Sequence, residues 1–370
     1  MLTNAATLEG YKKVWEGDLV SNIMLAWNGS LGFSPFNGIT SPAYSIYRLK
    51  TTDVNRYFHY LFRTELYKSE FKRNSSGVIE SRLRLYTDDF FRIVSVLPPL
   101  SEQTAIASFL DRKTALIDQA ITIKKQQIEL LKERRQILIH KAVTRGLNPN
   151  VKMKDSGVEW IGEIPEGWEV KRLKELCKAY GRIGFRGYTT SDLVGEGEGA
   201  ITISPSNIKE EFMTFEKCSY LSWEKYYESP EIQIKEDDIL MVKTGSTYGK
   251  IGIVKNLPLQ ATINPQLLVL KEIKINPNYF YSLLKTHIVQ TQVETNVIGS
   301  TIPTISETRI MNFKVQIPMI NEIEEIVIYT NDLNLKFDAA ISLKEQEIER
   351  LKEYKATLIN GAVTGKVKVG

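Results

Sequence analysis

The stretch DQAITIKKQQIELLKERRQILIHKAVT occupies residues 118–144, and DAAISLKEQEIERLKEYKATLINGAVT occupies residues 338–364. The two stretches are offset by 220 residues and are identical at 15 of 27 positions. An internal repeat of this kind decides the fold, because each copy is a structural unit that buries its apolar face against a neighbour. We therefore expect the rest of the chain to be organised around the two copies.

Within the first copy, side chains recur at alternating spacings of four and three residues, which is the heptad pattern of a paired helix. Both copies carry a cation at the third and sixth positions of this stripe, where a polar residue can fix register at a cost in stability. Two equal copies in one chain can satisfy each other. The stripe comprises Ile117, Ile121, Lys124, Ile128, Leu131, Arg135, Leu138 and Ala142, and adding 220 to each number gives its second copy.

The two helices are expected to begin and end alike. Ser101 and Asn321 closely follow prolines and are the predicted N-caps, while Gly146 and Gly365 are predicted to stop the helices. The 26 residues from the first to the last stripe position would span roughly 39 Å at about 1.5 Å per residue. Taken alone, such helices are also compatible with a hairpin that only joins two domains.

The repeat extends into the segments that precede the helices. Residues 14–33 match residues 234–253, and residues 54–64 match residues 276–286, which read as an aromatic helix in both copies. Short β-like runs with Gly, Ser and Asn turns surround these segments. We predict an α+β fold with a first β-rich domain at 1–98, a helical region at 99–147, a second β-rich domain at 148–318 and a second helical region at 319–370.

Composition narrows the class of protein. The chain of 370 residues is 42% hydrophobic, which suits two or three domains with cores. It has no apolar run of membrane-spanning length and no signal peptide, so a cytoplasmic protein without a membrane partner is expected. Cys177 and Cys218 lie too far apart in sequence for a CxxC metal pair. A net charge of +4 permits a nucleic-acid partner without requiring one.

Three phrases carry a family resemblance: LPPLSEQTAIASFLDRKTALID (97–118), IELLKERRQILIHKAVTRGL (128–147) and SGVEWIGEIPEGWEVKRLKEL (156–176). In this combination, with the second helix at the C-terminus, the chain resembles the specificity subunit of type I restriction–modification systems over nearly its whole length. The resemblance implies two target recognition domains that each read half of a split DNA sequence. It also implies that the two helices pair as an antiparallel coiled coil, hold the domains apart and dock methyltransferase subunits.

The resemblance further implies the partners and cofactors. Its partners would be double-stranded DNA and two methyltransferase (modification) subunits, with restriction/translocase subunits joining through the complex. S-adenosylmethionine, ATP and Mg²⁺ would bind to those partner subunits, and this chain itself would hold no cofactor. A helix pair of roughly 39 Å is close to one turn of B-DNA, about 34 to 36 Å, and suits a fixed gap between two half-sites.

The first half departs from this pattern. The second domain begins near Trp160, whose counterpart at the same offset would be residue 160 − 220 = −60. The first domain is therefore expected to lack about 60 residues, including any match to residues 181–207. A misplaced start codon, a truncated gene and a piece supplied by another polypeptide all fit. If the chain begins at Met1, an exposed core edge and poor reading of one half-site are expected.

Each candidate catalytic motif lacks a required residue or spacing. KTGSTYGK (243–250) is similar to a phosphate-binding loop but has the wrong spacing, and INPQL (263–267) lacks the second proline and the aromatic residue of amino-methyltransferases. DDILMVK (237–243) places acids near a lysine, but its counterpart in the first half has no lysine. We expect His59, His140 and His287 to be isolated from each other and from the cysteines, which supports neither a metal site nor a triad. The chain is expected to be non-catalytic.

DNA contacts are better supported, by basic, hydroxyl and amide side chains among small residues in loops. Arginine can bind guanine bidentately, asparagine can pair with adenine, and small residues let the backbone approach phosphate. A solvated turn is the alternative for each single residue. The candidates are Arg182, Arg186, Tyr188, Ser204, Asn207, Lys243, Thr244, Ser246, Thr247, Tyr248, Lys250, Ser300 and Thr301, with Asn22, Trp27 and Asn28 in the first half.

Three functions stay open on the sequence alone. The first is a DNA specificity subunit for a bipartite target. The second is a truncated or inactive specificity subunit that scaffolds methyltransferase subunits without full DNA selectivity. The third, a self-contained methyltransferase or nuclease, lacks the expected motifs. The cations of the first helix are either a solvated face or a contact to DNA or to partner subunits.

Overall fold

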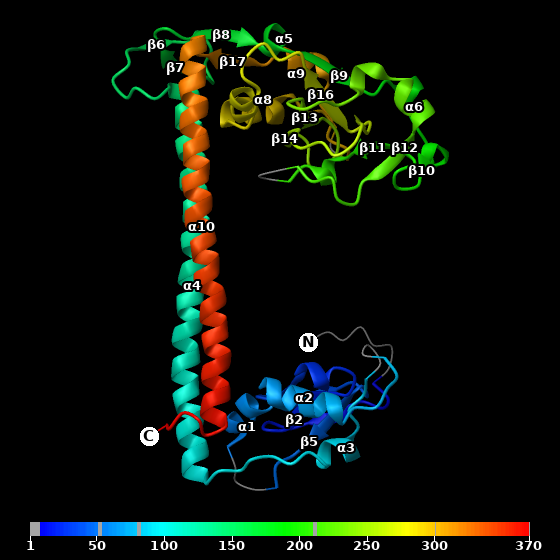
Figure 1. The fold of residues 1–370 in the computed structure, drawn as a ribbon, viewed down its shortest axis with the longest axis vertical. Coiled ribbons are helices and arrows are strands. Elements are labelled where there is room, and N and C mark those ends of the chain that lie inside the picture. Colours follow the sequence, from blue (N-terminus) through cyan, green and yellow to red (C-terminus); the bar gives the residue numbers. More distant parts are fainter. Residues whose placement is uncertain (1–7, 51–53, 80–82, 210–212, 300, 370) are drawn as a thin grey trace. The chain divides into compact units, whose positions relative to one another are not determined.

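A computed structural model of the chain describes residues 8–50, 54–79, 83–209, 213–299 and 301–369. The chain divides into two compact units: unit 1 comprises residues 1–129 with 341–370, and unit 2 comprises residues 130–340. Both long helices, α4 (Leu100–Arg145) and α10 (Ile320–Val363), contribute residues to both units (Figure 1). Each long helix is therefore divided between the two units. Within the described residues, no helix is both long and apolar enough to cross a membrane.

The helices run antiparallel. In unit 1, Asp118 of α4 accepts a hydrogen bond from Lys355 of α10 at 2.7 Å, while Lys124, further along α4, pairs at 2.7 Å with Glu347, which comes earlier in α10. In unit 2, Arg135 Nη1 donates to Asp338 Oδ1 at 2.7 Å. As the residue number rises on one helix it falls on the other, so the predicted antiparallel pairing is confirmed.

The 220-residue repeat is visible in these ion pairs. Adding 220 to Asp118 gives Asp338, and adding 220 to Arg135 gives Lys355, so the two units hold the same pair with the roles of the helices exchanged. The cations at the sixth stripe position therefore have ionic partners in both copies. The helices begin at Leu100 and Ile320, one residue before the predicted N-caps, which places those caps within the first turn instead.

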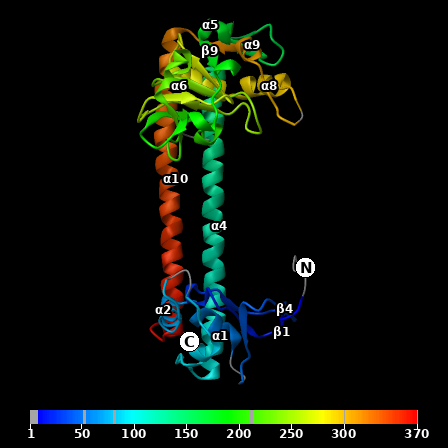
Figure 2. The ribbon, with the colours of Figure 1, turned by 90° about the vertical axis from the view of Figure 1, so that its right-hand side faces the viewer.

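Unit 1 contains a three-stranded sheet in the order β3-β2-β5 and a separate pair, β1-β4, whose strands are labelled in Figure 2. Its apolar core lies between the three-stranded sheet, the helices after it and the two long helices, and it includes Tyr57, Leu110 and Val363. The elements are β1 (Lys12–Val14), β2 (Leu19–Asn22), η1 (Ala26–Asn28), β3 (Leu31–Phe33), β4 (Gly38–Thr40), β5 (Tyr44–Tyr47), α1 (Asn55–Leu61), α2 (Glu65–Arg73) and α3 (Thr87–Phe91).

Unit 2 contains two four-stranded sheets, β10-β12-β11-β15 and β14-β13-β16-β9, and two short pairs, β17-β8 and β6-β7. Its helices are α5 (Leu173–Leu176), η3 (Gly184–Arg186), η4 (Thr190–Asp192), η5 (Pro205–Asn207), α6 (Trp223–Tyr227), η6 (Pro230–Ile232), α7 (Pro277–Leu284), α8 (His287–Asn296) and α9 (Glu307–Met311). Its strands are β6 (Met153–Asp155), β7 (Glu163–Pro165), β8 (Glu169–Arg172), β9 (Lys178–Gly181), β10 (Leu193–Val194), β11 (Gly199–Ile203), β12 (Ser219–Ser222), β13 (Ile239–Val242), β14 (Ile251–Ile253), β15 (Ala261–Ile263), β16 (Leu267–Lys271) and β17 (Lys314–Ile317).

All four residues of β13, ILMV, are buried, because apolar cores cover both faces of its sheet. A strand buried on both faces reads as a continuous apolar run, which is what this sequence shows. One core includes Met241 and contacts the long helices, and the other includes Leu240 and contacts the second four-stranded sheet. Together with unit 1, these sheets and paired helices confirm the predicted α+β fold.

Each unit packs on the C-terminal end of a long helix through a buried tyrosine. The Tyr57 hydroxyl lies 3.4 Å from the Val363 carbonyl and 3.2 Å from the Val96 carbonyl and can donate to either, and Tyr279 donates to the Val143 carbonyl at 3.1 Å. Burial raises the pKa of Tyr57 to about 12 and raises the pKa of Tyr279 well above its ordinary value. Because carbonyls at a helix end have no intrahelical donor, these bonds satisfy groups that would otherwise be buried unpaired.

Unit 2 has a further contact at this helix end. Trp168 is buried and its indole Nε1 donates to Glu322 Oε2 at 2.9 Å. Gly146, just past α4, has φ +75°, and a Cβ atom there would lie 2.5 Å from Glu322 Oε1. The left-handed backbone that ends the helix favours glycine here, and a Cβ atom would displace the Glu322 carboxylate that accepts from Trp168.

Candidate nucleic-acid interface

Five strand ends of unit 2 lie at one edge of its two sheets. β13 ends at Val242 where the antiparallel β16 begins at Leu267, and β9 ends at Gly181 beside the start of β16. β11 and β15 run parallel and end together at Ile203 and Ile263. Since loops leave a sheet where its strands end, the predicted DNA-contacting loops that follow these strands emerge on the same side.

Main-chain hydrogen bonds join these loops to one another. Lys243 N donates to Gln266 O, Ile305 N donates to Lys243 O, and Gly245 N donates to Pro303 O, each at 2.9 Å. The loops 243–250, 264–266 and 301–305 are therefore held as one surface, which we call the strand-end surface. Rigid placement of this kind is what a recognition loop needs to read bases.

Most predicted side chains on or beside the strand-end surface reach solvent. Ser246, Thr247 and Thr301 are exposed, whereas Ser300 lies outside the described residues. Hydroxyls and ammonium groups in such positions can contact phosphate or base edges. The half-buried members are Arg186, Tyr188, Ser204, Lys243, Thr244, Tyr248 and Lys250.

Arg182 is placed differently from the other candidates. It is only 6% exposed, and its guanidinium donates to the Ile263 carbonyl at 3.2 Å and to Thr262 Oγ1 at 3.0 Å. It also lies 5.1 Å from the centre of the Tyr188 ring. Burial lowers the pKa of Arg182 and raises that of Tyr188. Its donors serve the protein's own loops, so it fixes the segment that carries Tyr188.

Asn207 is likewise committed within the protein. It is 3% exposed, its Oδ1 accepts from Ser204 N at 2.9 Å, and its Nδ2 donates to the Thr214 carbonyl at 3.1 Å. Ser204 and Asn207 therefore cap the short η5 turn that follows β11. In this arrangement the amide is not presented to a ligand.

Two polar residues of the strand-end surface were missed by sequence reasoning. Gln266 is exposed, and Asn264 positions it by donating from Nδ2 to Gln266 Oε1 at 3.2 Å and by accepting from Gln266 N at 3.0 Å. Both belong to INPQL (263–267), for which the sequence predicts no catalytic role and, without the structure, no DNA contact. The useful signal was the Asn-Pro turn directly after a β-like run, since a glutamine held there can pair with adenine.

Unit 1 repeats the backbone of the strand-end surface. Ile23 N donates to Ala43 O at 3.0 Å and Leu85 N donates to Ile23 O at 2.9 Å, which match the bonds of Lys243 with Gln266 and Ile305. The side chains differ, because an isoleucine replaces the lysine and an alanine replaces the glutamine. The frame is therefore conserved between the units while the chemistry of the surface is not.

The three candidates of unit 1 lie in the loop after β2. Asn22 is 8% exposed and its Oδ1 accepts from Met24 N at 2.9 Å. Trp27 is half-buried, donates from Nε1 to the Met24 carbonyl at 2.9 Å and lies 5.7 Å from Lys72 Nζ. Asn28 is exposed. Only Asn28 thus presents its full side chain to solvent.

The acids of DDILMVK serve the fold. Asp238 is buried, accepts from Lys235 N at 2.8 Å and lies 3.4 Å from Lys271 Nζ. In unit 1, Asp18 forms a 2.7 Å ion pair with Arg48 at the equivalent position. Each carboxylate closes the turn into a strand, as expected, and no nuclease-like arrangement results.

One sequence interpretation is wrong. His140 and His287 are not isolated from each other, because His140 Nε2 and His287 Nδ1 are 2.9 Å apart in unit 2. The two imidazoles share one hydrogen bond, and burial is the main cause of the lowered pKa of His140. Among the described residues, no group of three or more His, Cys, Asp or Glu side chains could hold a metal ion.

Comparisons with known proteins agree with this architecture. The sequence profile described as "Type I restriction modification DNA specificity domain" matches residues 165–353. The chain is 26% identical over 366 residues to the type I restriction enzyme MjaVIII specificity subunit of Methanocaldococcus jannaschii, covering 96% of this chain and 78% of that one. It is 24% identical over 281 residues to the EcoBI specificity subunit of Escherichia coli, covering 73% of this chain and 58% of that one.

Two solved structures share the fold. A chain from a type I restriction–modification system aligns with a TM-score of 0.69 at 14% identity, covering 97% of this chain and 84% of that one. The HsdS subunit of Thermoanaerobacter tengcongensis aligns with a TM-score of 0.53 at 18% identity, covering 98% of this chain and 84% of that one.

Proposed function

Since the chain belongs to the type I restriction–modification DNA specificity family, we propose that it selects a bipartite DNA target and directs methyltransferase and endonuclease subunits to it. It is a non-catalytic specificity subunit. Methyl transfer and ATP-driven cleavage belong to the partner subunits, which we expect to bring S-adenosylmethionine, ATP and Mg²⁺.

The observation that carries the proposal is the strand-end surface, which recurs in both units on the same backbone frame. In unit 2 it presents Lys243 and Lys250 beside Gln266 and several hydroxyls. Lysines suit phosphate contacts that do not depend on sequence, whereas a glutamine amide can read adenine in the major groove. A surface that combines both kinds of group can hold DNA and discriminate among bases.

Individual roles follow from burial. We propose that Thr244, Ser246, Thr247, Tyr248 and Thr301 contact DNA directly, with Ser300 in the same loop. Arg182 and Asn207 act as positioning residues, because their polar atoms are used inside the protein. In unit 1 we propose direct contact for Asn28 and a supporting role for Asn22 and Trp27.

The repeat also bears on assembly. Two readers in one chain, connected by helices that enter both units, suit a target with two separated parts. The same repeat offers two related surfaces for partners, so we propose two methyltransferase subunits per chain. We place the complex in the cytoplasm, where its DNA and partners would meet.

The test is to purify the chain with its methyltransferase subunits and map methylated bases on random-sequence DNA. A split motif with two specified parts is expected. The paired variants Gln266→Ala and Ala43→Gln should each alter one part and leave the other unchanged. A contiguous half-motif would instead favour a scaffold in which one target recognition domain is active. Methylation by the isolated chain would show that it is an enzyme.

A further inference from the structure

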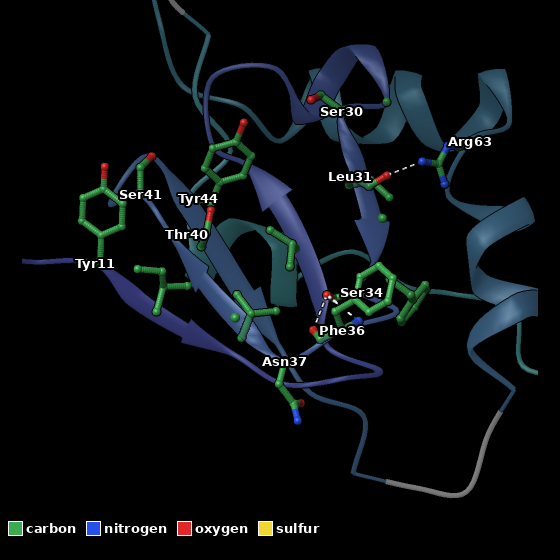
Figure 3. A pocket seen from close by; sticks show the side chains of 17 residues that line it. Tyr11, Ser30, Leu31, Ser34, Phe36, Asn37, Thr40, Ser41, Tyr44 and Arg63 are labelled. Atoms are coloured by element: carbon green, nitrogen blue, oxygen red, sulfur yellow. Dashed lines mark hydrogen bonds between the residues drawn. The ribbon is translucent and has the colours of Figure 1, made fainter. Parts of the chain in front are cut away.

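Unit 1 and unit 2 each contain a cavity, and the two cavities differ in chemistry. The groove of about 1040 Å³ in unit 1 is lined mainly by apolar, aromatic and small residues (Figure 3). Arg63, the cation in its lining, donates to the Leu31 carbonyl at 2.6 Å and so serves the fold. The cavity of about 440 Å³ in unit 2 is instead lined mainly by polar and charged residues. This second cavity therefore has the chemistry of an ionic site.

Cationic side chains gather at the unit 2 cavity. Lys141 and Arg145, in the last turn of α4, line it and are exposed. His140 and His287 line it as well. Burial is the main cause of the lowered pKa of His140, and the charges of His287 and Arg145 lower it further. One acid, Glu163, is also in the lining, so the cations of the cavity outnumber its acids.

The first turn of α8 lines the same cavity. His287 and Ile288 are its first two residues, and their N–H groups come before the first bonds of the helix. Those bonds run from Val289 N and Gln290 N to the Thr286 carbonyl at 3.1 and 3.0 Å. The first turn of α8 contains no acid. The helix start therefore offers backbone donors and a positive dipole end without a carboxylate of its own.

A buried amide in the cavity lining lacks a partner. Gln316 of β17 lines the cavity and is 0% exposed. Among the described residues, neither its Nε2 nor its Oε1 has a hydrogen-bond partner. Buried polar groups in folded proteins are nearly always hydrogen-bonded, because an unpaired group loses its water without compensation. The amide therefore calls for a polar group that enters the cavity.

The internal repeat shows that this chemistry belongs to unit 2. In unit 1, Glu65 follows the N-cap Thr64 of α2, as His287 follows the N-cap Thr286 of α8, so the start of α2 already has a carboxylate. The other counterparts in unit 1 carry no charge. At the 220-residue offset, the counterparts of His140, Lys141, Arg145 and Gln316 are Asn360, Gly361, Gly365 and Val96.

The cavity fits an anion better than a metal ion. His140 Nε2 and His287 Nδ1 are 2.9 Å apart and share a hydrogen bond. Among the described residues, no group of three or more His, Cys, Asp or Glu side chains could complete a metal site around them. Lys141 and Arg145 would repel a cation and attract an anion.

We propose that this cavity binds a tetrahedral oxyanion, a phosphate or sulfate group, between the last turn of α4 and the first turn of α8. Lys141 and Arg145 would supply the charge, and the N–H groups of His287 and Ile288 would donate to the oxygens. The Gln316 amide would donate from Nε2 and so gain its missing partner. This site is independent of the DNA selection proposed above.

Helix α8 connects the cavity to the strand-end surface. Gln290, in the first turn of α8, donates from Nε2 to the Gly249 carbonyl at 3.3 Å and to the Leu284 carbonyl at 3.0 Å. Gly249 belongs to the loop 243–250 of the strand-end surface. A bound oxyanion that orders the start of α8 would therefore also steady this loop.

The experiment follows hydrogen exchange of the full chain during a titration with sodium phosphate at constant ionic strength, with sodium chloride as the reference. We expect saturable protection of the amides at residues 285–290, because the N–H groups at the start of α8 gain an acceptor. The equivalent residues 63–68 of unit 1 should not change. This comparison removes the general stabilisation that phosphate gives to folded proteins. No protection, or equal protection of both units, would leave the amide to water and overturn the proposal.

Three variants test the residues. Arg145→Gln and Gln316→Val should each weaken phosphate binding at least about tenfold, the usual loss for a hydrogen bond to a charged group. Gln316→Val places the unit 1 residue in unit 2 and should not lower the unfolding temperature, because it removes an unpaired buried amide. Arg134→Gln is the matched control, since it removes an exposed charge of α4 outside the cavity lining.

The variants also contain the results that would contradict the site. Equal weakening by Arg134→Gln and Arg145→Gln would mean general charge attraction, and wild-type binding by Gln316→Val would take the buried amide out of the site. Either result would overturn the proposal.

The source of the oxyanion is identified by adding a random-sequence DNA duplex to the same titration. A duplex that protects residues 285–290 and raises the phosphate concentration needed for half-protection would assign the site to a backbone phosphate of DNA. A duplex that changes neither quantity would assign it to a free anion. Both results support the site.

Discussion

In unit 2 apolar cores cover both faces of the sheet that carries the strand-end surface, whereas the described residues of unit 1 form a core on one face of the equivalent sheet. The two units nevertheless share the hydrogen bonds that hold their loops, the tyrosine that binds a helix end and the ion pair between the long helices. The comparison teaches that the loop frame depends on the shared core at the helices. The second core adds buried apolar surface to unit 2.

The largest expected effect is a loss of stability in unit 2 that leaves unit 1 unchanged. Trp168→Ala should destabilise unit 2 by about 3–5 kcal/mol, the usual cost of truncating a buried tryptophan. The described residues of unit 1 have no equivalent tryptophan, so hydrogen exchange in residues 54–73 should not change. Trp160→Ala is the matched control, since that side chain is 48% exposed. Equal loosening of both units by Trp168→Ala would show that they do not unfold separately.

The second prediction compares the same strand position in the two units. Leu240→Ala should cost about 2–5 kcal/mol because the side chain is fully buried. Val20→Ala should cost about 1 kcal/mol or less, because Val20 is only half-buried. Urea unfolding of both variants measures the difference. Similar losses would mean that Val20 is packed as tightly in solution as Leu240.

The third prediction concerns DNA. Gln266→Ala should relax the specificity at one base pair by about 1–3 kcal/mol of discrimination. Lys243→Ala should weaken binding to all sequences alike and reduce the salt slope of log K by about 1. Titrations of the complex at several salt concentrations, with cognate and single-mismatch duplexes, separate the two effects. A uniform loss from Gln266→Ala would make it a backbone contact.

The fourth prediction compares the repeated ion pair. The Arg135 side chain is 8% exposed, whereas that of its counterpart Lys355 is 30% exposed. Arg135→Ala should cost about 1–2 kcal/mol, including the packing of its aliphatic stem. Lys355→Ala should cost about 0.2–1 kcal/mol, as expected for an exposed pair. Chemical unfolding in low and high salt measures both losses of stability. If Lys355→Ala costs more than Arg135→Ala in low salt and the two costs become equal in high salt, then charge attraction and not burial sets the cost.

The smallest expected effect is in pH dependence. The Arg48 hydrogen bond lowers the pKa of Asp18, so its contribution to unit 1 is present above the unfolded-state value of 3.8 and is lost as pH falls through the folded value. Burial raises the pKa of Asp238, so its contribution is present below 3.8 and is lost as pH rises through the folded value. Asp18→Asn should therefore reduce acid destabilisation and Asp238→Asn should not, in urea titrations across the acidic range.

The sequence predicted the two long helices and their pairing with each other, because the heptad spacing and the 220-residue offset can be read directly from the residues. It also located the loops of the strand-end surface by their small and polar residues. It could not rank those residues, because Arg182 is buried against Thr262, which lies 80 residues further along the chain, and Asn207 is bonded across a turn to the Thr214 carbonyl. Gln266 was missed for the same reason, since only the strand order places it beside Lys243.

Each unit contains the C-terminal end of the long helix that follows the other unit's domain, and this arrangement has a consequence for chain cleavage. Unit 1 contains residues 341–370 and unit 2 contains residues 130–147, so each unit is built from sequence on both sides of the exposed turn at 148–150. A protease that cuts this turn would sever the backbone without releasing either product. The Tyr57–Val363 and Tyr279–Val143 contacts would still join the two fragments, which would migrate together until a denaturant separates them.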